Sequence, residues 1–220
     1  MRLQNLLYAQ DRWALLAIFQ AMDAAGKDSA IKHVMSGVNP AGCQVASFKA
    51  PSPEELDHDY LWRCARHLPE RGRIGIFNRS YYEEVLVVRV HPEILARGSW
   101  RRELLEGDLW ERRLEDIRGF ERYLSRNGTA MRQVLPLRVA RRAAPPLPRA
   151  PRRSGQAVEV LGRRPGGARA LEALHARLRG GDPRHGRKHA PWYVIPADHK
   201  WFTRIVVAAA MVGRAGGARS

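Results

Sequence analysis

The chain has 220 residues, 45% of them apolar, which suits one ordinary globular domain, alone or with a tail. Its net charge is +16, but residues 131–187 contain fourteen Arg and only three acidic residues, so the rest has the charge of an ordinary enzyme surface. The chain lacks an apolar run near the roughly 20 residues of a membrane span, a signal peptide and a Cys-x-x-Cys pair, and we therefore expect a cytoplasmic protein.

From residue 11 to residue 129, apolar strand-like runs alternate with amphipathic stretches, a pattern typical of βα units around a parallel sheet. The predicted strands are residues 14–19, 45–49, 73–77 and 190–195. The predicted helices are residues 27–36, 53–67, 81–89, 100–126 and 198–212. This order predicts a three-layer α/β core.

Residues 131–187 differ sharply in composition from the chain on either side. Arg, Ala, Pro and Gly dominate this segment, and no Phe, Trp or Tyr occurs between Tyr123 and Trp192. Too little apolar surface is left to offset the entropy lost on ordering. We therefore expect disorder here, apart from a short helix over residues 168–179.

The loop after the first predicted strand has the composition of a phosphate-binding loop. Lys27 at the start of a helix places an ammonium and backbone N–H groups around one anion. The motif G-x-x-x-x-G-K-[ST] fails twice, because Ala21 replaces the first Gly and Asp28 replaces the hydroxyl. The alternative is that Gly26 only turns the chain. Asp23 favours the phosphate site, because a carboxylate beside phosphates needs a cation such as Mg²⁺ between them.

A second polar group, Asn78 and Arg79, ends the third predicted strand. Ligands of open α/β sheets bind outside the carboxyl ends of the strands, so both residues should face the crevice that Lys27 faces. A guanidinium binds phosphate through two parallel hydrogen bonds. The alternative is a surface arginine that pairs with Glu83 or Glu84.

Several stretches of the chain resemble the second polyphosphate kinase family. They are MDAAGKD (22–28), IKHVMSGVNP (31–40), FKAP (48–51), LPERG (68–72), IFNRSYYEEVLVVRVHP (76–92) and PWYVIPADHKWF (191–202). The resemblance covers residues 6–130 and 189–212. It implies a P-loop kinase-like fold and Mg²⁺-dependent phosphoryl transfer between inorganic polyphosphate and nucleotides. With Asn78, the second motif is similar to that of members that accept nucleoside monophosphates as well as diphosphates.

The resemblance also implies roles for individual residues. Asp23 would hold Mg²⁺ and orient the acceptor phosphate, and Asn78 and Arg79 would line the transfer site. The phosphate chain would be bound by Lys27 and the backbone N–H groups of Ala24, Ala25, Gly26, Lys27 and Asp28. The implied catalytic residues are Asp23, Lys27 and Arg79. AMP, ADP, GMP and GDP are the candidate nucleotides, and a homo-oligomer is the implied assembly.

Two departures from the family pattern bear on activity. Family members continue after residue 129 with another core strand and then a helical lid, and we expect residues 131–187 to replace both, from a displaced reading frame or as an Arg/Pro-rich linker. In addition, the chain begins only a few residues before the resemblance. Both departures predict an open site and weak activity. The alternatives are an inactive or unstable remnant, or a basic polyanion-binding or nucleic-acid-binding protein, although the aromatic residues of a single-strand platform are missing.

Overall fold

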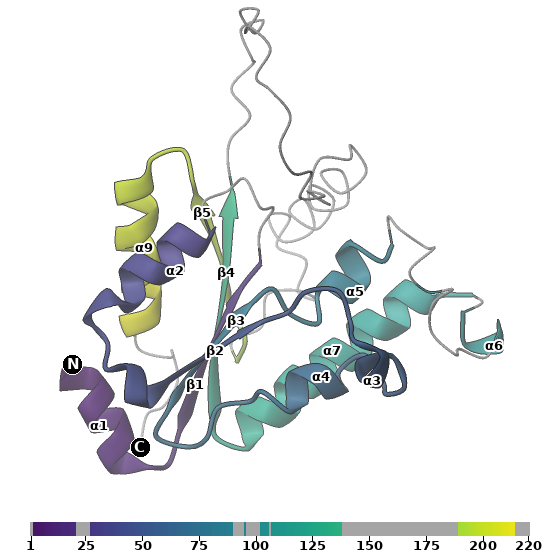
Figure 1. Cartoon of the computed structure of the whole chain (residues 1–220), viewed down its shortest axis with the longest axis horizontal. Coiled ribbons are helices and arrows are strands. Elements are labelled where there is room, and N and C mark those ends of the chain that lie inside the picture. Colours follow the sequence, from purple (N-terminus) through teal and green to yellow (C-terminus); the bar gives the residue numbers. More distant parts are fainter. Residues whose placement is uncertain are drawn as a thin grey trace, which may run out of the picture.

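A computed structural model describes residues 2–20, 27–89, 95, 102–105, 107–137 and 189–213 (Figure 1). Several sequence-based expectations fall outside these residues. They are the roles of Asp23, Ala24, Ala25 and Gly26, the helix at 168–179, and the disorder, lid replacement and origin expected for residues 138–187.

The described residues form a parallel sheet of five strands in the order β2-β3-β1-β4-β5. The strands are β1 (Ala14–Phe19), β2 (Cys43–Ser47), β3 (Ile74–Asn78), β4 (Thr129–Leu137) and β5 (Trp192–Pro196). Helices cover both faces, so the predicted three-layer α/β core is confirmed (Figure 1).

One face of the sheet carries α1, α2 and α9, and the other carries α3, α4, α5 and α7 (Figure 1). The helices of the first face are α1 (Arg2–Gln10), α2 (Lys27–Val34) and α9 (Lys200–Val212), and 3-10 turns follow at Met35–Gly37 and Pro40–Gly42. The other helices are α3 (Pro53–Leu56), α4 (Trp62–Ala65), α5 (Glu83–Leu86), α6 (Arg102–Leu105) and α7 (Leu109–Arg126). None of the described helices is long and apolar enough to cross a membrane.

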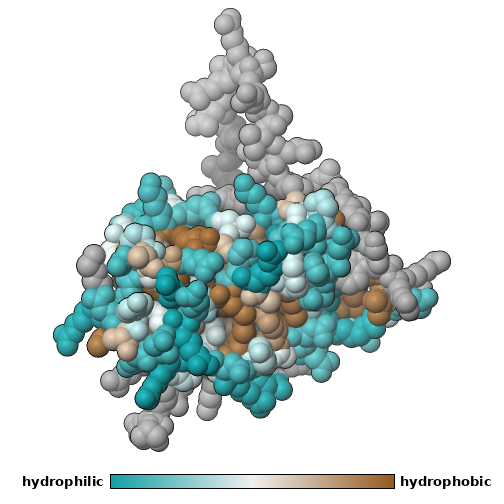
Figure 2. All heavy atoms as spheres, turned by 60° about the horizontal axis from the view of Figure 1, so that its bottom comes forward, coloured by the Kyte–Doolittle hydropathy of each residue, from teal (hydrophilic) through white to brown (hydrophobic). Residues whose placement is uncertain are grey.

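Alternate residues of the central strand β1 supply two apolar cores. Leu16 and Ile18 belong to the core under α7, whereas Ala17 and Phe19 belong to the core under α2 and α9. Parallel strands that are covered on both faces are buried on both faces, which explains the continuous apolar run in β1. Elsewhere, apolar patches lie between hydrophilic side chains on the surface shown in Figure 2, as on most globular proteins.

Strand β4 corrects the expectation for the start of the Arg-rich segment. Residues 131–137 were expected to replace a core strand, but they form most of one, between β1 and β5. Composition averaged over the whole segment hides the apolar residues Met131, Val134 and Leu135, which are fully buried. The family-like core therefore extends at least to Leu137.

Pro136 does not disrupt β4, because of where β1 ends. The backbone of Val134 bonds toward β1, and that of Gln133 bonds toward β5. Backbone groups of successive strand residues point alternately to the two neighbouring strands, so the nitrogen of Pro136, two residues after Val134, points toward β1. The last β1 partner is Phe19, opposite Val134, so Pro136 lies beyond the ladder that would have required its missing N–H.

Three predicted helices are shorter than expected or divided. The predicted helix at 53–67 is interrupted between α3 and α4, where the Asp59 carboxylate accepts hydrogen bonds from the N–H groups of Leu61 and Trp62. The helix predicted at 100–126 divides into α6 and α7, and Gly107 lies between them with a φ of 72°. In place of the helix predicted at 81–89, α5 covers only Glu83–Leu86.

A core substitution tests the position of β4. We expect Leu135→Ala to lower the free energy of unfolding by about 2–5 kcal/mol, because it removes buried methyl groups and leaves a cavity. Val45→Ala is the control, since Val45 on β2 is 55% exposed and should change stability by well under 1 kcal/mol. Urea unfolding monitored by tryptophan fluorescence measures both. Equal, small losses would contradict a buried β4.

Candidate functional site

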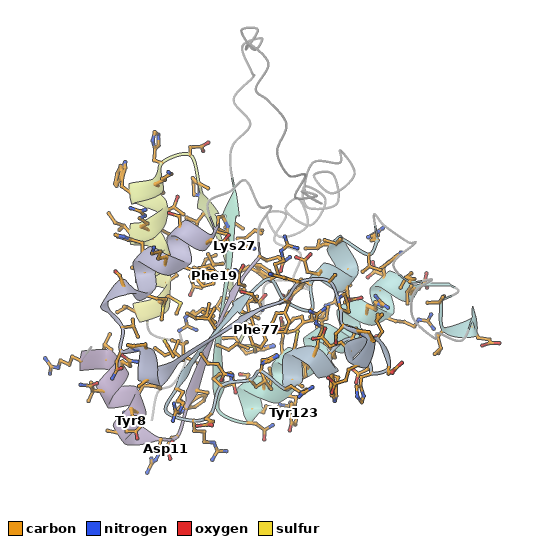
Figure 3. All side chains as sticks on the ribbon, in the orientation of Figure 1. Tyr8, Asp11, Phe19, Lys27, Phe77 and Tyr123 are labelled. Carbon is orange, nitrogen blue, oxygen red and sulfur yellow. The ribbon has the colours of Figure 1, made fainter. Side chains whose placement is uncertain are left out.

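The candidate site lies where the carboxyl ends of β1 and β3 meet. Phe19, the last residue of β1, pairs with Asn78, the last residue of β3. Helix α2 begins with Lys27 at the same edge of the sheet, and Figure 3 shows Lys27 near Phe19 and far from Asp11 at the opposite edge. The structure thus brings the beginning of α2 and the end of β3 together, as the sequence predicts.

Lys27 is only 4% exposed although it is the first residue of its helix. A buried ammonium is stable only with anionic or polar partners. The N-terminus of an α-helix adds a partial positive charge from its N–H groups. Lys27 and the end of α2 therefore both place positive charge at this edge of the sheet.

Asn78 connects β3 to the first turn of α2. Its Nδ2 donates to Asp28 Oδ1 over 2.8 Å, so the amide and the carboxylate hold the two elements together. The other amide atom, Asn78 Oδ1, is buried and has no hydrogen-bond partner among the described residues. An oxygen acceptor of this kind can bind a donor or a hard cation supplied by a ligand.

Arg79 has an unusual backbone conformation for a residue with a side chain. Its φ is 67°, in the left-handed region, which costs on the order of 1–3 kcal/mol for a residue other than glycine. The Arg79 N–H donates to the carbonyl of Phe19 over 2.9 Å, which fixes the turn against the end of β1. Strain of this kind is common at functional sites.

The Arg79 guanidinium lies near Glu83, one of its two candidate ion-pair partners. Arg79 Nη1 is 3.9 Å from Glu83 Oε2, and the two side chains are 32% and 20% exposed. Glu84 instead pairs with Arg113 across 2.9 Å, on the side of α7. The contact with Glu83 is long, so it leaves the function of Arg79 open between pairing and phosphate binding.

Sequence reasoning missed a polar cluster behind Arg79. Gln20, the residue after β1, is 2% exposed; its Nε2 donates to Glu83 Oε1, and its Oε1 accepts from Ser80 Oγ over 3.3 Å. Gln20 thereby joins the end of β1 to the turn after β3. Only the position of Gln20 in the sequence could have identified it, because a polar residue directly after a buried strand lies at the edge of the sheet where ligands bind.

The remaining site predictions concern residues outside the described ranges. Asp23 and the N–H groups of Ala24, Ala25 and Gly26 stay predictions for this reason. Among the described residues, no group of three or more His, Cys, Asp or Glu could hold a metal ion. Mg²⁺ at phosphate sites requires only one or two carboxylates, since substrate phosphates and water supply the other ligands.

Comparison with known proteins adds independent information. The family model described as "Polyphosphate kinase 2 (PPK2)" matches residues 1–142. A relative from Rhodopseudomonas palustris, named ADP-polyphosphate phosphotransferase, is 62% identical over 128 residues, which are 58% of this chain and 44% of the relative. The chain therefore spans less than half of that relative's length.

Two further proteins match nearly the whole chain. A relative from Meiothermus ruber, named AMP/ADP-polyphosphate phosphotransferase, is 38% identical over 219 residues, which are 96% of this chain and 75% of the relative. The crystal structure of polyphosphate kinase 2 from Arthrobacter aurescens is 30% identical, with a TM-score of 0.69 over 98% of this chain and 74% of its own. With its five-stranded parallel sheet and these matches, the chain belongs to the polyphosphate kinase 2 family and has its P-loop kinase-like fold.

Proposed function

We propose that the chain transfers phosphoryl groups between inorganic polyphosphate and nucleoside mono- or diphosphates. Family membership supports the reaction class, and the observation that carries the proposal is the meeting of Lys27, Asn78 and Arg79 at the carboxyl ends of β1 and β3. In the forward direction, the bridging P–O bond at the end of the polyphosphate breaks. A terminal phosphate oxygen of the nucleotide forms the new P–O bond, and the shortened chain keeps the bridging oxygen.

Positioning and charge neutralisation are the tasks of the protein in this reaction. Phosphoryl transfer needs little covalent help, and no side-chain nucleophile is required. We assign the phosphate chain to Lys27 and the N–H groups of residues 24–28. Arg79 faces the transferred group, where a planar guanidinium stabilises the charge that spreads over the equatorial oxygens.

The oxygen donors of the site suit Mg²⁺. The Asp28 carboxylate is exposed at this edge of the sheet, and Asn78 Oδ1 lacks a partner among the described residues. Hard cations prefer such ligands. We assign the metal to Asp23 with support from Asp28 and Asn78. When bound, Mg²⁺ neutralises phosphate charge and orients the reacting oxygens.

The nucleotide is proposed to be AMP or ADP. The Meiothermus relative, which this chain matches along most of its length, is named for both nucleotides, and the Rhodopseudomonas relative is named for ADP. A more distant relative from Mycobacterium tuberculosis, named for GDP, matches only 40% of this chain. We further propose a cytoplasmic homo-oligomer, and the free thiols of Cys43 and Cys64 agree with a reducing compartment.

A nucleotide-by-nucleotide assay tests the proposal. The protein is incubated with polyphosphate and Mg²⁺ and with AMP, ADP, GMP or GDP, and the products are separated by ion-exchange chromatography. We expect phosphorylation of AMP and ADP above that of the guanine nucleotides. Polyphosphate binding without turnover would support a polyanion-binding protein, whereas the absence of a cooperative unfolding transition would indicate an unstable remnant.

The metal assignment has its own test. Asp23→Asn should raise the Mg²⁺ concentration for half-maximal activity by about tenfold or more, because it removes a charged ligand. Asp11→Asn is the control, since Asp11 is exposed at the opposite edge of the sheet (Figure 3). A Mg²⁺ titration at saturating polyphosphate measures both midpoints, and an unchanged midpoint in Asp23→Asn would place the metal elsewhere.

A further inference from the structure

A buried carboxylate in the second half of α7 contacts the segment that follows the candidate site. Glu121 is only 5% exposed, and its Oε1 accepts three hydrogen bonds. The donors are Tyr81 OH at 3.0 Å, Tyr82 OH at 2.9 Å and Gln133 Nε2 at 2.8 Å. One oxygen atom therefore joins α7 to strand β4 and to the two tyrosines.

The two tyrosines follow directly after Asn78, Arg79 and Ser80 in the chain. Both tyrosines are buried, and each ring packs edge to face on a different aromatic ring. The ring centroids of Tyr81 and Phe120 of α7 are 5.8 Å apart, and those of Tyr82 and Trp192 of β5 are 4.9 Å apart. The segment after Arg79 is thus fastened to α7 and to β5, with Glu121 as the common acceptor of both hydroxyls.

The turn at Arg79 needs such a fastening on both sides. A residue other than glycine keeps a positive φ only where the surrounding structure holds it. On the near side, the pairing of β3 and the bond from the Arg79 N–H to Phe19 fix the backbone. On the far side, the Tyr82 N–H donates to Ser80 Oγ, and Ser80 in turn contacts Gln20.

We propose that Glu121 is a positioning residue for phosphoryl transfer: through the hydroxyls of Tyr81 and Tyr82 it holds the turn at Arg79, and with it the guanidinium, at the transfer site. This inference rests on the proposed function. Glu121 touches no substrate, so its effect on turnover passes through Arg79.

The ionisation of Glu121 decides the conditions of the test. Burial raises the pKa of Glu121 to about 7, against the opposing effects of the hydrogen bonds from Tyr82, Tyr81 and Gln133 and of the positive charge of Arg118. Near pH 8 the carboxylate is mostly ionised and accepts hydrogen bonds most strongly. The comparison is therefore made at pH 8.

Glu121→Gln in the full chain is the principal variant, because it keeps the shape of the side chain and removes its charge. We expect amide hydrogen exchange at residues 79–83 to become about tenfold faster, with exchange in β2 (Cys43–Ser47) unchanged. We expect kcat to fall about tenfold and KM for the nucleotide to stay within about twofold, since a displaced Arg79 affects the transition state most. Glu115→Gln, at an exposed position of the same helix, should change neither quantity.

Two further measurements keep the inference falsifiable. Tyr82→Phe removes one donor without altering the carboxylate, and it should produce a smaller change of the same kind. In an Arg79→Lys background, Glu121→Gln should add little further loss of turnover, because both changes act through the same guanidinium. Additive losses would show that Glu121 acts independently of Arg79.

The exchange measurement separates this inference from the proposed function. If the parent protein shows no turnover with polyphosphate, the proposed function fails, whereas exchange at residues 79–83 still reports whether Glu121 holds the turn. Unchanged exchange there, or equal acceleration in β2, would overturn the positioning role. The second result would show that Glu121 only stabilises the fold as a whole.

Discussion

Lys27→Ala is expected to reduce polyphosphate-dependent turnover on the order of 100-fold or more. The ammonium is buried at the first residue of α2, where the N–H groups of the helix end add their partial positive charge. Negative charge builds up on the bridging oxygen that leaves with the shortened polyphosphate as its P–O bond breaks, so a cation beside the phosphate chain binds more strongly in the transition state than in the ground state. The loss should therefore appear in kcat more than in KM.

Lys32→Ala is the matched control for this prediction. Lys32 belongs to the same helix, is exposed, and lies more than one turn away from the carboxyl edge of the sheet. The control removes an equal charge and should leave turnover within about twofold. If the parent is inactive, the comparison is made by melting temperature, which polyphosphate should raise in the parent and in Lys32→Ala but not in Lys27→Ala. Equal behaviour of the two variants would contradict the role of Lys27.

The convergence of Lys27, Asn78 and Arg79 could be predicted because it depends on strand order and strand ends. A buried apolar run identifies each strand, and the polar residues that follow it must lie at the carboxyl edge. The register of β1 and β3 then places Phe19 opposite Asn78, as observed. Local sequence identifies the strand ends, whereas the strand order and the pairing of β1 with β3 come from the structure.

Strand β4 could not be found by the same reasoning. Its nine residues include Arg132, Gln133 and Pro136, and an Arg-rich stretch follows them in the sequence. In the structure, the buried Arg132 guanidinium is satisfied by backbone carbonyls, including those of Ala210 at 3.1 Å and Gly213 at 2.9 Å at the end of α9. These partners are about 80 residues away in the chain, so the sequence around Arg132 does not predict them.

The polar contacts behind the site are equally non-local. Gln20 and Glu83 are 63 residues apart in sequence, and Glu121 lies 40 residues beyond Tyr81. In the sequence, nothing distinguishes Glu121 from the exposed acidic residues of its helix. Its side chain is buried because of the way α7 packs on the sheet. Helix boundaries failed for a related reason, because the Asp59 turn and Gly107 end helices that apolar periodicity would continue.

Arg79→Lys is expected to lower turnover about tenfold or more although it conserves the charge. An ammonium cannot reproduce the planar fork that binds two phosphate oxygens at once. The left-handed backbone at residue 79 has a similar conformational cost for lysine and for arginine, so the free energy of unfolding should change little. Arg126→Lys, an exposed change at the opposite edge of the sheet, is the control and should leave kcat unchanged.

Arg79→Lys also distinguishes the two possible roles of Arg79, which are pairing with Glu83 and binding phosphate. If Arg79 only pairs with Glu83, lysine supplies the same positive charge to that partly exposed pair, and both turnover and melting temperature stay at the parental level. The pair is long, at 3.9 Å, and partly exposed, and such pairs contribute about 0–1 kcal/mol. Loss of that contact alone cannot account for a tenfold fall in turnover at unchanged stability. A selective fall in kcat would therefore assign the guanidinium to the transferred phosphoryl group, and parental turnover in Arg79→Lys would assign it to Glu83.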